Sequence, residues 1–181
     1  MRLIILIFFS IIFFSCNTIN KDFLIQFKKV NSVEELNSFS DKKIPNVNLN
    51  ILEKTNEVNS FVFNINTEYY FGNQYKLNDD FIILSYKKIY RPIYKPVFNM
   101  INWNDVFLCI YSLKKNEVVS KLKISSSDPM YSKYKYSSET FNIKSFYFSY
   151  RYNEENNSSI FVSDSIEERY KVVENRFVKI D

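Results

Sequence analysis

The sequence of 181 residues contains no histidine, no alanine, a single glycine and only two cysteines. Without histidine, the chain lacks the usual general base, the base of Ser-His and Cys-His nucleophile pairs, and the commonest transition-metal ligand. Phosphate-binding loops of the P-loop or dinucleotide type need glycines where the backbone approaches the phosphate, so a nucleotide cofactor is not expected. We therefore predict a protein that is not an enzyme and that uses no cofactor or metal.

The remaining composition is that of an ordinary globular domain. Hydrophobic residues make up 46% of the chain and charged residues 24%, which allows one domain with a real core. Aromatic residues reach 18%, but they accompany a richness in Asn, Lys and Ile that is typical of A/T-rich codons, so this percentage alone does not indicate a sugar-binding surface. The formal net charge of +4 is too small to predict nucleic-acid binding.

The first sixteen residues carry the strongest signal. Arg2 precedes an apolar run over Leu3–Phe14, and a helix of that length, at about 1.5 Å per residue, is too short to cross a hydrocarbon core of about 30 Å. The run is typical of a signal peptide. Ser15 and Cys16 follow it, and this ending resembles a bacterial lipobox, in which a small residue precedes a lipidated cysteine. The alternative is a structural cysteine that happens to follow an apolar stretch.

The lipobox interpretation fixes the predicted organisation of the chain. Residues 1–15 are a lipoprotein signal peptide, residues 16–22 are the lipidated Cys16 and a polar tether, and residues 23–181 form a single β-rich domain. Acyl chains at Cys16 would hold the protein on a membrane without spanning it. Cys109 is then the one remaining thiol, and its apolar surroundings in the sequence favour a small core residue over a catalytic thiol.

Local patterns predict one short helix and many strands. Ser32 and Glu35 match a capping box, which predicts a helix that reaches about Phe39. Alternation of Val47, Leu49 and Ile51 with asparagines predicts a strand. Gly72-Asn73 is a signal for a two-residue hairpin turn between strands at 68–71 and 74–77.

The second half of the chain reads as a run of hairpins. We predict strands at 81–90, 106–113, 118–124, 141–152, 160–162, 169–173 and 176–180, with Glu174-Asn175 as the last turn. Asparagine tolerates left-handed backbone, so it can replace the missing glycines. The predicted fold class is mainly β, with one short N-terminal helix. Three architectures fit: an antiparallel sandwich, an open barrel or a meander of hairpins.

Two features are candidates for a binding surface. Tyr90, Arg91, Tyr94 and Lys95 interleave aromatic and basic residues beside two prolines, which favours an extended edge or loop. This segment either forms an aromatic platform for an anionic glycan or a protein, or is a soluble strand edge that resists aggregation. Trp103, the only tryptophan, lies among asparagines and is either an exposed anchor for a sugar or protein or a residue that caps the core.

Other charged clusters have simpler explanations. Tyr and Lys alternate over residues 131–136 and could stack nucleic-acid bases, but export from the cytoplasm argues against this function. The pairs Asp79-Asp80, Glu154-Glu155 and Glu167-Glu168 invite comparison with glycosidases, yet neighbours on a strand point to opposite faces and cannot flank one bond. We interpret them as solvated turn charges.

Taken together, Cys16 and its lipobox, the Asn/Lys/Ile/Tyr richness and the closing hairpin at 168–180 make the chain similar to small lipoproteins of Bacteroidota-type Gram-negative bacteria. This resemblance implies a cell-envelope location with a lipid anchor, in the outer membrane rather than the inner one, and carries no catalytic residues. The leading functional hypothesis is a non-enzymatic domain that binds another envelope or secreted protein. The alternatives are a glycan-binding module that uses Trp103, and an immunity-type inhibitor of a secreted toxin.

Overall fold

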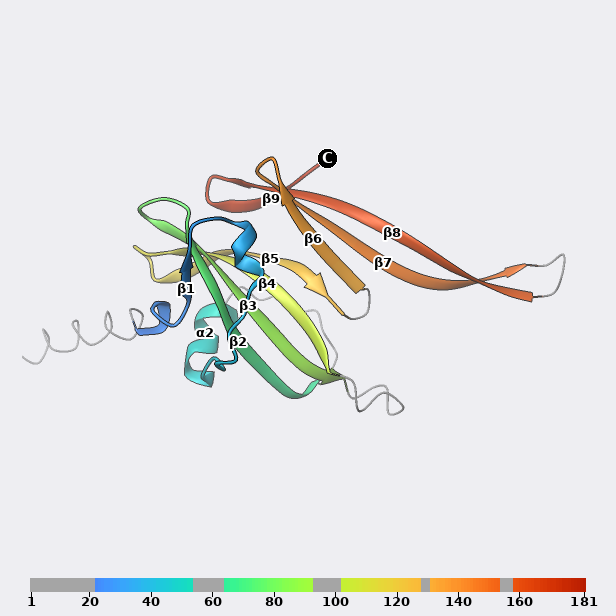
Figure 1. Cartoon of the computed structure of the whole chain (residues 1–181), viewed down its shortest axis with the longest axis horizontal. Coiled ribbons are helices and arrows are strands. Elements are labelled where there is room, and N and C mark those ends of the chain that lie inside the picture. The colour runs from blue at the N-terminus through green and yellow to red at the C-terminus, as the bar shows by residue number, and fades with distance from the viewer. Residues whose placement is uncertain (1–21, 54–63, 93–101, 128–130, 154–157) are drawn as a thin grey trace, which may run out of the picture.

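A computed structural model describes residues 22–53, 64–92, 102–127, 131–153 and 158–181. It shows a mainly β protein with one open sheet of nine strands, arranged side by side in chain order (Figure 1). Of the three predicted architectures, the meander is therefore correct. All neighbouring strands are antiparallel except β1 and β2, which are parallel. The strands are β1 (Lys28–Val30), β2 (Asn64–Lys76), β3 (Phe81–Pro92), β4 (Trp103–Ser112), β5 (Glu117–Ser126), β6 (Tyr131–Ser137), β7 (Thr140–Asn153), β8 (Ser158–Val173) and β9 (Arg176–Ile180).

Strands β2 to β5 form a central sheet that is buried on both faces. One face, the helix-covered face, packs against the helical residues 22–24 and helix α2 (Asn46–Glu53). Its buried members include Phe23, Phe27, Leu52, Phe71, Leu84 and Tyr111. The other face, the strand-covered face, packs against the short 3-10 helix η1 (Glu34–Asn37) and strands β6 to β9. Its members include Leu36, Ile83, Leu108, Ile110, Ile124 and Phe141.

The sheet turns back on itself where β5 meets β6. These two strands share a single register pair, Ser126 with Ser132, so they separate soon after they meet. Farther along, the backbone N–H of Phe177 in β9 donates a hydrogen bond of 3.0 Å to Ser120 Oγ in β5. The last four strands therefore cover the strand-covered face instead of continuing the sheet outward.

Helix α2 corrects the predicted strand at Val47, Leu49 and Ile51. The segment forms a helix over Asn46–Glu53 directly after Pro45, whose fixed φ suits the start of a helix. Leu52 is completely buried, Leu49 packs partly against the same core, and Val47 is 73% exposed. The three-residue spacing of Leu49 and Leu52 places both on one helix face, so the alternation over five residues was too short to distinguish strand from helix.

The predicted capping-box helix is also wrong in detail. Only a single turn of 3-10 helix forms, over Glu34–Asn37, and Val33 precedes it without a side-chain capping bond. Val33 and Leu36 are both buried. Residues three apart lie on the same side of a 3-10 helix, so burial of this pair favours a 3-10 turn over an α-helical turn. Ser32 does not cap this helix.

The predicted hairpin turn at Gly72-Asn73 lies within a continuous strand. β2 runs through both residues, and its register with β3 shifts between Phe71 and Gln74, which marks a β-bulge. Gly72 does not have a positive φ. Glycine is needed for another reason, because a Cβ there would lie 2.5 Å from the carbonyl oxygen of Ser85. The chain turns instead at residues 77–80.

The other turns and strands agree closely with the sequence prediction. Glu174 and Asn175 have φ values of 48° and 60°, as a two-residue type I′ turn between β8 and β9 requires. The β4–β5 hairpin and strand β7 lie where the alternation placed them. Two predicted strands, at 160–162 and 169–173, are parts of the single strand β8.

Candidate functional site

The predicted aromatic and basic surface lies where β3 and β4 approach their shared hairpin. Tyr90 and Trp103 are register partners across these strands, and their rings meet edge to face with centroids 6.4 Å apart. Their exposed fractions are only 6% and 9%. Arg91 pairs with Ile65 of β2, and Tyr94 and Lys95 lie outside the described residues. The structure thus brings Tyr90 and Trp103 together as a packed pair, and it makes Trp103 a core residue.

Lysines cover the aromatic rings next to this pair on the helix-covered face. Tyr86 and Phe107 stack with centroids 5.1 Å apart, and Lys121 Nζ lies 4.4 Å from the Phe107 centroid. Lys88 Nζ lies 5.1 Å from the Tyr90 centroid. Such cation–π contacts stabilise by roughly 0.5–1 kcal/mol each at partly exposed sites. The basic and aromatic residues of β3 therefore take part in contacts within the sheet.

A buried carboxylate also lies on this face, and the sequence prediction missed it. Asp105 is 7% exposed and is the register partner of Lys88. Its Oδ1 accepts a hydrogen bond of 2.6 Å from Ser126 Oγ, which ties β4 to the end of β5. In the sequence, Asp105 follows Asn104 in a polar stretch, so no local signal separated it from a turn residue.

The second basic and aromatic cluster is packed in the same way. Tyr134 and Tyr136 of β6 pack partly against the core of the strand-covered face. Burial, with a smaller contribution from Glu34, raises the pKa of Tyr134 to about 12. Lys133 Nζ lies 5.5 Å from the ring of Phe146. The rings of Tyr134 and Tyr136 therefore contribute to packing.

A cavity of about 230 Å³ lies where the second half of the chain meets the β2–β3 hairpin. It is lined by Tyr75, Ile83, Tyr136, Glu139, Phe141 and Lys171, among others. Burial raises the pKa of Tyr136, and Glu139 adds to the shift. The lining mixes aromatic rings with one acidic and one basic side chain, but no hydrogen bond converges on the space to define a ligand.

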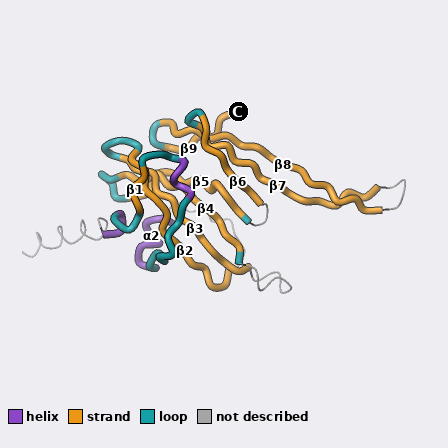
Figure 2. The backbone as a smooth tube through the Cα atoms, in the orientation of Figure 1, coloured by secondary structure: helices purple, strands orange, loops and turns teal. Residues whose placement is uncertain are grey.

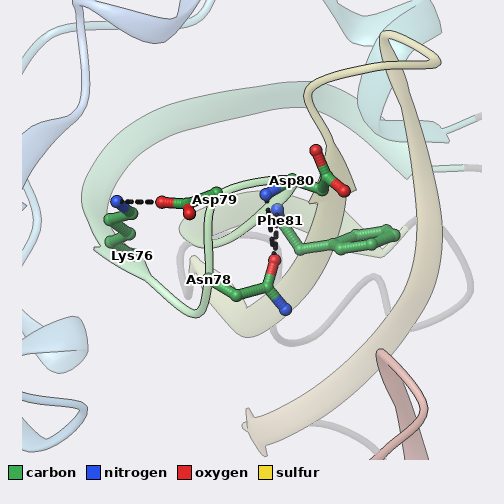
Figure 3. Close-up of polar contacts among 5 residues, drawn as sticks. All are labelled: Lys76, Asn78, Asp79, Asp80 and Phe81. Atoms are coloured by element: carbon green, nitrogen blue, oxygen red, sulfur yellow. Dashed lines mark hydrogen bonds and ion pairs between the residues drawn. The ribbon is translucent and has the colours of Figure 1, made fainter.

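The first acid pair, Asp79-Asp80, lies in the turn between β2 and β3 (Figure 3). Asn78 Oδ1 accepts hydrogen bonds from the backbone N–H groups of Asp80, at 3.0 Å, and of Phe81, at 2.9 Å. Lys76 Nζ lies 2.6 Å from Asp79 Oδ1, and this hydrogen bond lowers the pKa of Asp79. The carboxylates of the two aspartates point away from each other (Figure 3).

The described residues contain neither a candidate metal cluster nor a candidate membrane-spanning helix. Among the described residues, no group of three or more His, Cys, Asp or Glu side chains could hold a metal ion. Cys109 is in no disulfide and has no exposed surface, and it lies in the core of the helix-covered face. In the part of the chain that the structure describes, no helix has the length and apolar character needed to cross a membrane.

The most prominent feature is a two-stranded arm, which we define as residues 147–153 of β7 and 158–164 of β8. It extends well past the other described elements (Figures 1 and 2). β6 begins at Tyr131, opposite Phe146, and β9 pairs only with residues 169–173 of β8. Among the described strands, the two strands of the arm therefore pair only with each other. Its length of seven residue pairs corresponds to about 20 Å at roughly 3.4 Å per residue.

The base of the arm is regular and exposed. β7 and β8 pair continuously from Phe141 with Tyr170 to Asn153 with Ser158, without a register shift. Tyr147 donates a hydroxyl hydrogen bond of 3.0 Å to Asp164 across the two strands. Ile166, just below the arm, is 48% exposed. The long alternation at 141–152 was the sequence signal for this feature, but alternation alone does not say how many neighbours a strand has.

Comparisons with protein-family models, with curated proteins and with solved structures find no match. The residues and geometry of this chain are therefore the basis for its proposed function.

Proposed function

We propose that this protein is a lipid-anchored, non-enzymatic lipoprotein of the bacterial cell envelope that binds another envelope or secreted protein through its arm. The anchor is Cys16, after removal of residues 1–15. The observation that carries the binding proposal is the arm itself, whose two strands extend past the sheet and pair only with each other among the described strands.

An isolated arm adds little stability to the domain and exposes strand edges, so its presence favours a contact function. A two-stranded ribbon alone in water is only marginally stable, and its free edges risk aggregation. Contact with a partner would stabilise the ribbon and cover those edges. Its direction also suits a contact role, because the described chain starts at one end of the molecule and the arm points away at the other (Figure 1). A protein tethered through its N-terminus would then present the arm away from the tether.

Metabolic labelling with a palmitate analogue tests the anchor. The wild-type chain should carry the label and fractionate with membranes, and Cys16→Ser should lose the label and move to the soluble fraction. Cys109→Ser is the matched control, since it removes the other cysteine, and it should keep both properties. Label retained in Cys16→Ser would contradict the proposed anchor.

Site-specific photo-crosslinking in living cells tests the binding function. A photo-reactive residue at Ile166, 48% exposed beside the arm, is compared with one at Val47, 73% exposed on α2. We expect a discrete crosslinked protein from position 166 and none from position 47. Shortening the arm should abolish the crosslink at 166. Equal crosslinks from both positions, or no crosslink from 166, would contradict the proposed function.

A further inference from the structure

The outer edge of β8 is the longest stretch of open strand edge in the described part of the chain. β8 runs over Ser158–Val173, and β9 pairs with it only from Arg169 onward. Residues 158–168 therefore pair with β7 on one side and with no described strand on the other. Every second backbone N–H and C=O group of such an edge points outward and can bond to an added strand.

The two terminal strands of the sheet, β1 and β9, carry the usual protection against strand addition, and residues 158–168 of β8 do not. β1 is only three residues long and contains Lys28 and Lys29. β9 is five residues long, contains Arg176 and Lys179, and bonds to β5 through Phe177. Residues 158–168 contain no lysine, arginine or proline, and their register with β7 has no bulge. Lysine, proline, bulges and short length are the devices that normally protect an edge.

The charge of this edge indicates what kind of strand it fits. Asp164, Glu167 and Glu168 are its charged residues, and all three are acidic. Asp164, Ile166 and Glu168 share one face of β8, because alternate residues of a strand lie on the same face. On that face Ile166 lies between two carboxylates, and Lys179 of β9 already pairs with Glu168 at 2.7 Å. Asp164 is therefore the carboxylate of this face that most favours a Lys or Arg beside an apolar residue on an added strand.

A second copy of this chain is a poor occupant of the same edge. If two β8 edges paired with each other, Asp164 and Glu167 from each chain would lie along one seam, in addition to Glu168, which is paired with Lys179. Like charges across strands are destabilising. The edge thus favours a different, basic partner.

We propose that residues 158–168 of β8 bind an extended basic segment of the partner protein as an additional strand of the sheet. This inference depends on the proposed binding function and specifies how the partner is held. Backbone hydrogen bonds to the β8 edge give the affinity, and the Asp164, Ile166 and Glu168 face selects the side chains. The arm extends the same edge outward, so the added strand would continue along it.

Amide hydrogen exchange on the full chain in detergent tests this directly. The probe is a synthetic peptide that repeats Lys-Thr-Val-Thr, which puts Lys and Val on one strand face. We expect exchange within residues 158–168 to slow about fivefold or more, the factor that one net hydrogen bond gives. Two control peptides, one with Glu in place of Lys and one with Pro in place of Thr, should give no protection, because they reverse the charge or remove backbone donors.

Two matched variants locate the effect. Ile166→Lys places a cation on the proposed face and should lose the protection, whereas Val178→Lys makes the same change at a 41% exposed position on β9 and should retain it. Absence of protection at 158–168, equal protection by the Glu peptide, or full protection of Ile166→Lys would overturn the proposal. So would protection that appears without peptide as protein concentration rises, because the occupant would then be a second copy.

The two proposals fail in different ways. A crosslinked partner at position 166 without any protection of the β8 edge would preserve the binding function and reject strand addition. Absence of a crosslink from position 166 in the chain with an intact arm would reject the binding function itself.

Discussion

The central sheet and the arm differ in sequence as well as in burial. Apolar residues follow one another without a polar break over 81–84 in β3 and 106–111 in β4, whereas Ser149 and Arg151 interrupt the aromatic residues of the arm in β7. In the central sheet, Leu84 and Leu108 are completely buried on opposite faces. Beside the arm, Ile166 is 48% exposed. Consecutive apolar residues therefore fit strands that are covered on both faces, and the number of covering layers determines how much each residue stabilises the fold.

This contrast separates stability from the proposed contact function. The central sheet gains from apolar burial at roughly 25 cal/mol per Å² on both faces. In the arm, among the described strands, each strand pairs only with the other. We therefore expect changes in the central sheet to affect unfolding, and changes in the arm to affect binding.

The largest expected effect is truncation of a buried leucine. Leu84→Ala should lower the free energy of unfolding by about 2–5 kcal/mol, because it leaves a cavity in a fully covered face. Ile166→Ala is the control and should change it by no more than about 0.5 kcal/mol. Urea unfolding followed by circular dichroism measures both. Similar losses in the two variants would remove the distinction between the regions.

Gly72→Ala should destabilise by about 1–3 kcal/mol through overpacking in the central sheet. The added methyl group would meet both the hydroxyl and the backbone of Ser85, whose carbonyl oxygen would lie 2.5 Å away. Adding Ser85→Ala relieves only the hydroxyl contact. The double variant should therefore remain less stable in urea than Ser85→Ala alone, and equal stability of these two would contradict the backbone clash.

Tyr111→Phe should stabilise the protein by up to about 1 kcal/mol at pH 7, because the buried Tyr111 hydroxyl has no hydrogen-bond partner among the described residues. Tyr70→Phe is the matched control and should destabilise, since the Tyr70 hydroxyl donates a hydrogen bond of 2.6 Å to Glu68. Urea unfolding of both variants measures the two signs. A loss of stability in Tyr111→Phe would show that its hydroxyl is satisfied.

The same residue gives a pH dependence. Burial raises the pKa of Tyr111 to about 12, while in the unfolded chain tyrosine ionises near pH 10. Between about pH 10 and 12 the unfolded state binds fewer protons than the native state, so the stability present below pH 10 falls as pH rises. Tyr111→Phe should make this alkaline loss smaller, and an unchanged slope would contradict the assignment.

The smallest expected effect on stability comes from shortening the arm. Replacing residues 149–162 with Asn-Gly joins the paired residues Phe148 and Ser163 by a type I′ turn. We expect the free energy of unfolding to change by no more than about 0.5 kcal/mol, the size of an ordinary surface change. Urea unfolding measures it, and a large loss would show that the arm supports the central sheet.

The sequence predicted those elements whose conformation is determined by residues close to one another in the chain. The mainly β class, the β4–β5 hairpin and the left-handed turn at Glu174-Asn175 all follow from alternation and from asparagine at turns. Helix α2 could not be predicted in this way, because Leu52 is buried by a core built from distant strands. Gly72 could not either, since its role depends on Ser85 of the neighbouring strand.

The candidate sites show a similar division. Tyr90 and Trp103 were identified as aromatic residues of interest, but only the pairing of β3 with β4 reveals that they pack on each other. The open edge of β8 was not predicted at all. Of its residues, only 160–162 were predicted to form a strand. No described strand pairs with the outer side of 158–168 because β9 is short, and sequence alternation does not encode the length of a neighbouring strand.

Cys109 lies within β4 and has no exposed surface, so the reactivity of its thiol measures opening of the core. In a Cys16→Ser chain it is the sole thiol. Its side chain lies in the core of the helix-covered face, so a thiol reagent can reach it only when the covering helices or the strands separate. Its labelling rate therefore reports how often this core opens, and we expect changes in the arm to leave that rate unchanged.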